Sequence, residues 1–149
     1  MAREKIVMRK YYYILSLLFV FVIPTIIAAY FVLERVRLDQ LAIFVVSITL
    51  LGSVWDMWAT RHGKRDPVWI WTFNHRDTLG IRFRDIPIEE YLFYLVSSVY
   101  IVFLWELIRY TIEHTNPILY AVLPFLALWS MLFIAVPYFA REKKDRMRR

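Results

Sequence analysis

Long uncharged runs separated by short charged segments set the pattern of this chain. The first run, Tyr11–Leu33, holds 23 residues without a charged side chain. A bilayer core about 30 Å thick needs roughly 20 helical residues to cross it, so this run predicts a spanning helix. Pro24 lies near its middle, and because proline is tolerated in membrane helices and usually kinks them, we expect a bend there.

The next two runs are too short to cross a bilayer unless charged residues join them. Gln40–Trp55 holds sixteen uncharged residues, so the helix is expected to continue through Asp56. Tyr91–Trp105 holds fifteen and directly follows Glu89 and Glu90. A spanning helix here draws both glutamates toward the hydrocarbon boundary, where ionisable groups are costly and indicate function.

A fourth uncharged run, Thr115–Ala140, is long enough to span, with bends expected at Pro124 and Pro137. The pattern therefore predicts an all-α integral membrane protein, a small bundle of about four transmembrane helices in one domain of residues 1–149. The predicted helices cover residues 11–33, 40–60, 87–109 and 115–140, with a connection at 61–86 and a basic tail at 141–149.

Composition supports the membrane class and excludes several kinds of site. The chain is 60% hydrophobic, whereas a soluble domain is about 45–50% apolar even by a count that includes glycine. Its 149 residues leave room for one compact unit. Cysteine is absent, which excludes disulfides, iron–sulfur ligation and thiol nucleophiles. The three glycines cannot form a Rossmann or P-loop nucleotide site.

The 19 lysines and arginines are distributed unevenly between the two sides of the predicted bundle. Four lie in residues 1–10, six in 61–86 and six in 141–149, against three in the two opposite turns. Because cytoplasmic loops carry the excess of positive charge, both termini and the 61–86 connection are predicted to be cytoplasmic in a multi-pass protein of the cell membrane. This topology accounts for the net charge of +6 with the lipid bilayer, and no nucleic acid, as partner.

The predicted topology gathers three acids at one side of the membrane. Asp56 ends the second predicted helix, and Glu89 and Glu90 begin the third, so all three are expected around one cavity at the cytoplasmic interface. Glu34 and Glu106 belong to the opposite side and cannot join them. The sequence thus predicts a polar site at the cytoplasmic end of the bundle.

Two interpretations of the adjacent glutamates stay open. In the first, Asp85 caps the third helix and the glutamates complement the helix dipole in its first turn. In the second, at least one carboxyl group faces neighbouring helices, because adjacent residues point about 100° apart on a helix. Burial and a nearby like charge favour a protonated carboxyl group, which can donate a proton near neutral pH. Two interpretations of Asp56 also stay open: its side chain is either solvated among the lipid headgroups or part of the site.

Aromatic side chains are concentrated in the third predicted helix. The aromatics are packing residues by default, although their π faces could stabilise a carbocation in a dry pocket. They are Tyr91, Phe93, Tyr94, Tyr100, Phe103 and Trp105.

The histidines do not form a metal-binding motif. His62, His75 and His114 show neither HExxH nor another close spacing, so no metal site is predicted.

Four short motifs in fixed order carry a resemblance to a known family. They are Trp55-Asp56, Trp71-Thr72-Phe73-Asn74, Leu79-Gly80-Ile81 and Pro87-Ile88-Glu89-Glu90-Tyr91-Leu92-Phe93. Over roughly residues 11–110, the chain resembles the lycopene cyclase domain family, the FAD-independent, membrane-embedded type. It departs from the family pattern in two respects. Arg61–Val68 makes the link between the first and second motifs longer than usual. The chain also contains one copy of the domain, whereas complete cyclases of this type generally combine two.

The resemblance implies a non-redox isomerisation of lycopene at its ψ-end groups. A carboxylic acid protonates the terminal double bond, the cation closes onto the neighbouring alkene, and a base removes a ring proton to leave a β-ionone ring. No cofactor is consumed. By matched position, the resemblance makes Glu89 and Glu90 the acid/base pair and Asp56 a supporting acid. It places the substrate against four further residues, Trp71, Asn74, Phe93 and Tyr94.

The resemblance also implies a protein partner, a second cyclase domain in a homodimer or heterodimer. Three other functions stay open on the sequence. The chain could cyclise a longer C50 carotenoid, or it could be a non-catalytic membrane scaffold that orders other pigment enzymes. A proton-coupled carrier is the third.

Overall fold

The computed structural model describes residues 11–63, 73, 78–114, 117–129 and 131, and most of these residues are helical. The elements in chain order are α2 (Tyr12–Leu17), the π-helix η1 (Leu18–Val22), α3 (Ile23–Val32), the 3₁₀ helix η2 (Leu33–Arg35), α4 (Leu38–Gly63), β1 (Arg82–Phe83), β2 (Ile86–Pro87) and α5 (Ile88–His114). An apolar helix, Pro117–Trp129, follows them. The predicted all-α membrane class is confirmed, with one small hairpin added.

Three helices are long and apolar enough to cross a bilayer, namely Tyr12–Arg35, Leu38–His62 and Ile88–His114. They correspond to the first three predicted spans. Of the fourth predicted span, 115–140, the structure describes the helix Pro117–Trp129 and residue 131, and the rest lies outside the described residues.

The prediction that the third helix ends near Arg109 is wrong, because α5 continues to His114. The charged residues of its last turns pair with one another along the helix surface. Arg109 lies 3.2 Å from Glu106 and 3.8 Å from Glu113, at the spacings of three and four residues that bring helical side chains together. Paired in this way, the charges do not end the helix.

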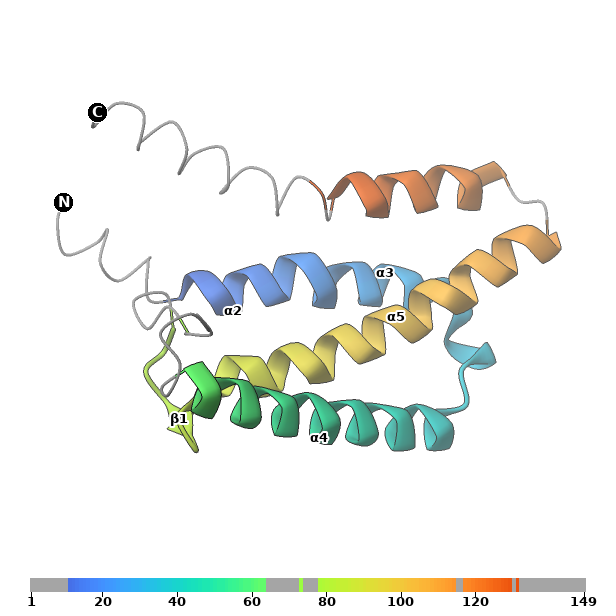
Figure 1. The fold of residues 1–149 in the computed structure, drawn as a ribbon. Coiled ribbons are helices and arrows are strands. Elements are labelled where there is room, and N and C mark those ends of the chain that lie inside the picture. Colours follow the sequence, from blue (N-terminus) through green and yellow to red (C-terminus); the bar gives the residue numbers. More distant parts are fainter. Residues whose placement is uncertain (1–10, 64–72, 74–77, 115–116, 130, 132–149) are drawn as a thin grey trace, which may run out of the picture.

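α5 is the central helix of the bundle (Figure 1). α4 packs against it, and so do α2, η1 and α3. The start of α2, the end of α4 and the start of α5 meet beside β1 at one end of the bundle, which we call the hairpin end. The end of α3, the start of α4 and the end of α5 lie at the other end, the distal end.

Pro24 lies in the first turn of α3, directly after a π-helical segment of the first span. The segment just before it, η1, is a π-helix in which Ile23 N–H bonds to Leu18 C=O, five residues back. The next donor in that register would be Pro24, which has no N–H to offer Phe19 C=O. The indole N–H of Trp129 donates to Phe19 C=O at 2.7 Å. A neighbouring helix therefore supplies the hydrogen bond that the proline cannot.

The main hydrophobic core and most of the buried polar residues occupy different halves of the bundle. The hydrophobic core joins α3, α5 and the helix Pro117–Trp129 in the distal half, and its buried residues are Ala28, Val32, Val36, Phe103, Leu107, Leu119 and Leu126. Apart from Thr111, the buried polar residues in the described ranges lie toward the hairpin end. They are Ser53, Asp56, Thr78, Glu89 and Ser98.

β1 and β2 form a two-stranded antiparallel hairpin that precedes α5. Its turn residues Arg84 and Asp85 have φ of 49° and 69°, and positive φ at both central residues is the geometry of a tight hairpin turn. Asp85 therefore sits in this turn, so its predicted role as the cap of the third helix is wrong. The Tyr91 hydroxyl donates to Phe83 C=O at 3.2 Å and holds the hairpin against α5.

Candidate active site

Asp56 lies in the interface between α4 and α5. The residue is 1% exposed, and its Oδ2 accepts a hydrogen bond of 3.1 Å from the Tyr94 hydroxyl. Of the two interpretations of Asp56, the structure supports the buried one and contradicts solvation among the headgroups. Tyr94 thereby becomes a partner of the acid, where the resemblance had made it a substrate contact.

Gly52 makes room for this pairing. It lies one helical turn before Asp56, and a Cβ built on Gly52 would collide with the ring of Tyr94. Small residues let membrane helices approach closely. The Tyr94 ring can therefore lie flat against α4 and deliver its hydroxyl to the carboxylate one turn further along.

Glu90 lies at the start of α5 and is half-buried. Its carboxyl group lies close to the side chain of Tyr13 on α2. Asp56 and Glu89 both lie close enough to act on it electrostatically. The three predicted acids are thus brought together at the hairpin end, with Tyr13 as a fourth member from the first span.

Glu89 has different surroundings from its neighbour. It is 0% exposed, and its Oε1 accepts a hydrogen bond of 2.5 Å from the backbone N–H of Leu79. Its Oε2 is buried and has no hydrogen-bond partner among the described residues. One oxygen of Glu89 therefore fixes the segment before the hairpin, and the other is buried without a partner in the described part of the chain.

Phe93 packs toward the first span. Its ring meets Phe21 edge to face with centroids 5.7 Å apart, and it meets Tyr94 at 5.5 Å. Phe93 therefore belongs to an apolar wall that joins η1 to α5 beside the acids. The predicted substrate contacts Trp71 and Asn74 lie outside the described residues.

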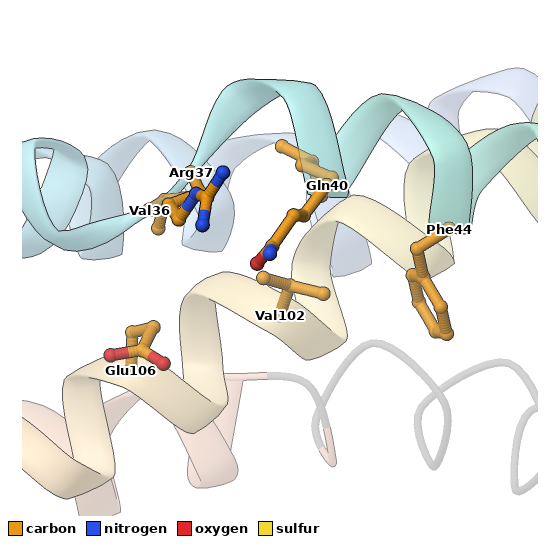
Figure 2. Close-up of a pocket in the computed structure, with 7 residues that line it drawn as sticks. Val36, Arg37, Gln40, Phe44, Val102 and Glu106 are labelled. Carbon is orange, nitrogen blue, oxygen red and sulfur yellow. The ribbon is translucent and has the colours of Figure 1, made fainter.

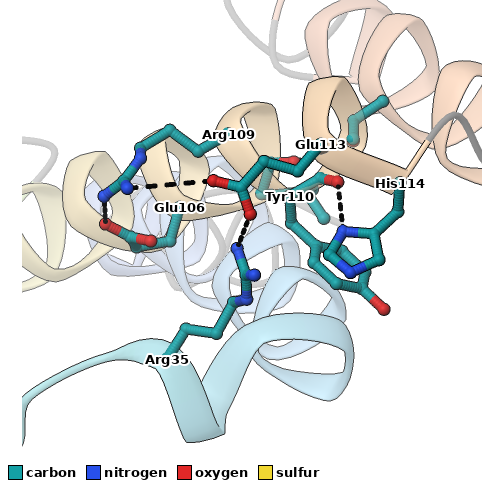
Figure 3. A network of polar contacts seen from close by, with 8 residues as sticks. Arg35, Glu106, Arg109, Tyr110, Glu113 and His114 are labelled. Atoms are coloured by element: carbon teal, nitrogen blue, oxygen red, sulfur yellow. Dashed lines mark hydrogen bonds and ion pairs between the residues drawn. The ribbon is translucent and has the colours of Figure 1, made fainter.

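Glu106 lies away from this site, as the sequence predicted. It lines a cavity of about 240 Å³ between the start of α4 and the second half of α5, with Arg37 and Gln40 on the facing side (Figure 2). Beyond it, a network of ion pairs links η2 to α5 (Figure 3). In that network Glu113 lies 2.7 Å from Arg35.

The chemistry available at the hairpin end is proton transfer. Three carboxyl groups and two phenol hydroxyls meet there, and buried ionisable groups in a membrane protein mark functional sites. Carboxyl groups can give a proton to a bound molecule and take one away. Among the described residues, no group of three or more histidine, aspartate or glutamate side chains is arranged to hold a metal ion.

Sequence reasoning missed three contributors to this site, namely Tyr13, Gly52 and the amide of Leu79. Tyr13 lies near the start of its helix, and the membrane interface is the usual place for a tyrosine at a helix end, so its position in the sequence did not indicate a site. Gly52 carried a signal, because it precedes Asp56 by four residues and so lies on the same helix face. No signal in the sequence pointed to the Leu79 amide, because the direction of this N–H depends on how the segment before the hairpin folds.

A family model described as lycopene cyclase matches residues 2–108 of the 149-residue chain. The chain belongs to the lycopene cyclase family. No curated protein and no solved structure matches it.

Membership in the lycopene cyclase family supports a carotenoid cyclase role, with isomerase-type activity, in a membrane protein. The matched range contains the three acids and both tyrosines of the site. It ends within α5, so the helix Pro117–Trp129 lies beyond it.

Proposed function

We propose that this lycopene cyclase family member converts the ψ-end groups of lycopene to β-ionone rings by acid/base catalysis. A carboxyl group gives its proton to the terminal alkene carbon, the neighbouring double bond closes onto the resulting cation, and a carboxylate removes a ring proton. One proton enters and one leaves, so the product keeps the composition of the substrate and no cofactor is consumed.

In this proposal Glu90 is the proton donor and Asp56 is the base. The Tyr94 hydroxyl from α5 holds Asp56, and Glu90 lies close to Tyr13 of the first span. A hydrogen bond such as that from Tyr94 fixes a carboxyl group in one orientation, which proton transfer to a bound substrate requires. The single observation that carries the proposal is that these two acids, 34 positions apart in the chain, meet beside one apolar wall.

Glu89 supports the site in this proposal. One of its oxygens is already engaged by Leu79 N–H, which leaves it less free to turn toward a substrate than Glu90. Its bond holds the segment before the hairpin over the start of α5.

The membrane setting supports the proposed substrate and orientation, and the family resemblance supports the proposed protein partner. A carotene is apolar and dissolves in the bilayer, so it reaches the Phe21–Phe93 wall sideways from the lipid. We place the acids at the cytoplasmic side, with both termini there, because most lysines and arginines lie on that side. A second cyclase domain, in a homodimer or a heterodimer, completes the enzyme.

Replacement of Glu90 by glutamine tests the donor directly. Glutamine keeps the size and a hydrogen-bonding oxygen but has no carboxyl proton to give. In cells that accumulate lycopene, and that also supply a second cyclase domain, we expect Glu90→Gln to lower the ratio of cyclised carotene to lycopene by about 100-fold or more. The ratio is measured by chromatography of extracted pigments, at equal amounts of inserted protein.

Glu106→Gln is the matched control, because it makes the same chemical change on α5 at the distal end, where Glu106 pairs with Arg109. It should keep the ratio of the unaltered protein. The proposal fails if the unaltered, stably inserted chain leaves lycopene unchanged both alone and with a second domain. Full activity of Glu90→Gln would remove Glu90 from the donor role.

A further inference from the structure

A row of polar side chains follows α4 where that helix faces α5. Thr49, Ser53, Asp56 and Thr60 are spaced by four, three and four residues, so they lie on one helix face. At 1.5 Å per residue, the row extends about 16 Å along the helix axis. Across the interface, α5 presents a similar row. Its members are Glu90, Tyr94 and Ser97. We call the two rows together the polar seam.

Three buried oxygen atoms in and beside the polar seam have no hydrogen-bond partner among the described residues. They are Thr49 Oγ1, Thr60 Oγ1 and Glu89 Oε2. Buried polar groups in folded proteins nearly always have a partner, which is either a protein group or an ordered water molecule. These three atoms therefore indicate a ligand with hydrogen-bonding capacity.

The other hydroxyl groups of the spanning helices show what a threonine or serine does when nothing else is available. Ser16, Thr25 and Ser47 each donate to the backbone carbonyl four residues earlier, at 2.7 to 2.8 Å. Within the polar seam, Ser53 makes the same bond to Thr49 C=O at 2.6 Å. The hydroxyl groups of Thr49 and Thr60 do not make this bond. Both oxygen atoms are buried, on the helix face that carries Asp56.

An apolar carotene cannot be the missing partner, because it offers no hydrogen-bond donor or acceptor to an oxygen. Water satisfies such groups, and a buried water molecule typically makes about three hydrogen bonds. Polar residues inside a bilayer that face other helices commonly line proton pathways. The polar seam starts at Thr60, near the end of α4, and reaches past Asp56 to Thr49 in the middle of the helix.

We propose that internal water molecules occupy the polar seam and pass protons between the carboxyl groups of Asp56, Glu89 and Glu90. The need for such a path rests on the proposed function. After each ring closure the base holds the proton that it removed, and the donor has lost its own. Along a row of water molecules and hydroxyl groups, each O–H bond breaks as the next forms, so Asp56 loses one proton as Glu90 gains one.

The absence of cysteine from the chain allows a direct test of water in the seam. Single cysteines at Thr49, Ser53 and Thr60 each give one S–H infrared band in membranes, with no background from other thiols. On transfer to D₂O the band shifts as water exchanges the proton. Because a bilayer core holds almost no water, we expect these thiols to exchange at least about tenfold faster than Ser47→Cys, which faces outward from the same helix.

The exchange measurement is independent of activity. Exchange at positions 49 and 60 that is as slow as at position 47 would overturn the proposal, whatever the enzyme does. Fast exchange in a protein that never cyclises carotene would support the water path and overturn the proposed function. Fast exchange with an active enzyme supports both.

A second measurement tests whether the water path is used. Thr60→Val removes the hydroxyl group and keeps the shape of the side chain. We expect it to lower kcat about tenfold and to leave KM unchanged, because the path acts on proton return and not on substrate binding. Ser47→Ala, which removes an outward-facing hydroxyl from the same helix, should change neither constant. Equal kinetics for the two variants would show that protons do not pass through Thr60.

Discussion

Three carboxyl groups within one region of this protein have three different surroundings. Asp56 accepts a hydrogen bond from a tyrosine across a helix interface, Glu89 accepts one from a backbone amide, and Glu90 lies close to a tyrosine of the first span. Adjacent residues on a helix point about 100° apart, so Glu89 and Glu90 cannot share one environment. This separation allows one glutamate to position a backbone segment while its neighbour is available for proton transfer.

Gly52 is the residue on which the Tyr94–Asp56 pair depends most directly. In Gly52→Ala, the new methyl group meets the Tyr94 ring and pushes its hydroxyl away from the carboxylate. Overpacking of a close interface costs typically about 1–3 kcal/mol. We expect this loss of stability in thermal unfolding of the detergent-solubilised protein, together with a clear fall in cyclised carotene in cells.

Ser47→Ala provides the comparison, because it also introduces alanine on α4 but at an exposed position. It should leave stability and product ratio unchanged. A double variant should separate the loss of stability from the loss of activity. Gly52→Ala combined with Tyr94→Leu removes the collision with the ring, so it should recover part of the stability and none of the activity. If Gly52→Ala alone keeps full activity, the close approach of Tyr94 is not part of the site.

At the scale of elements, the first span is shaped by its proline. Pro24 breaks the backbone ladder, a π-helical turn takes up the distortion, and the indole of Trp129 donates to the carbonyl that the proline leaves. The helix Pro117–Trp129 is thereby attached to the first span by a polar contact as well as by the apolar core. The same span carries Tyr13, so its path affects the site.

A double-mutant cycle tests this explanation of the Trp129 contact. Trp129→Phe removes the indole donor and should destabilise the protein by about 1 kcal/mol. Pro24→Ala restores a backbone N–H that can donate to Phe19 C=O. In that background, Trp129→Phe should therefore destabilise the protein less. We expect a coupling of at least about 0.5 kcal/mol between the two changes, measured by thermal unfolding. Strictly additive costs would contradict a shared acceptor.

At the scale of the whole molecule, the two halves of the bundle have different tasks. The distal half holds the apolar core and the ion pairs that join η2 to α5. The half at the hairpin end holds the three acids and most of the buried polar residues. Burying polar groups contributes less to the stability of the fold than burying apolar groups does. Apolar packing in the distal half can therefore hold the helices together while the other half contains the polar site.

The orientation of the bundle in the membrane can be measured with single cysteines. Asp85→Cys lies in the turn of the hairpin and Asp39→Cys at the start of α4, and both positions are exposed. If the hairpin end is cytoplasmic, a membrane-impermeant thiol reagent should label Asp39→Cys in intact cells and Asp85→Cys after lysis. The reverse pattern would place the acids on the outer side and contradict the assignment from charge.

Much of this architecture is encoded locally. Uncharged runs of sufficient length determine where helices lie, so the first three spans could be predicted from the sequence. Because consecutive spans alternate in direction, the end of the second and the start of the third had to share one end, which brought Asp56 to Glu89 and Glu90. The hairpin was harder to predict, because its turn uses Arg84 and Asp85 with positive φ where glycine or asparagine is the usual signal.

The partners of the acids were decided by tertiary structure alone. Tyr94 and Asp56 are 38 positions apart, and their meeting depends on how α4 and α5 are rotated and how closely Gly52 lets them approach. The same holds for Tyr13 beside Glu90 and for Leu79 N–H on Glu89. Helical periodicity assigns each residue to a face of its own helix. Which faces meet is set by packing between helices, and a single sequence does not state it.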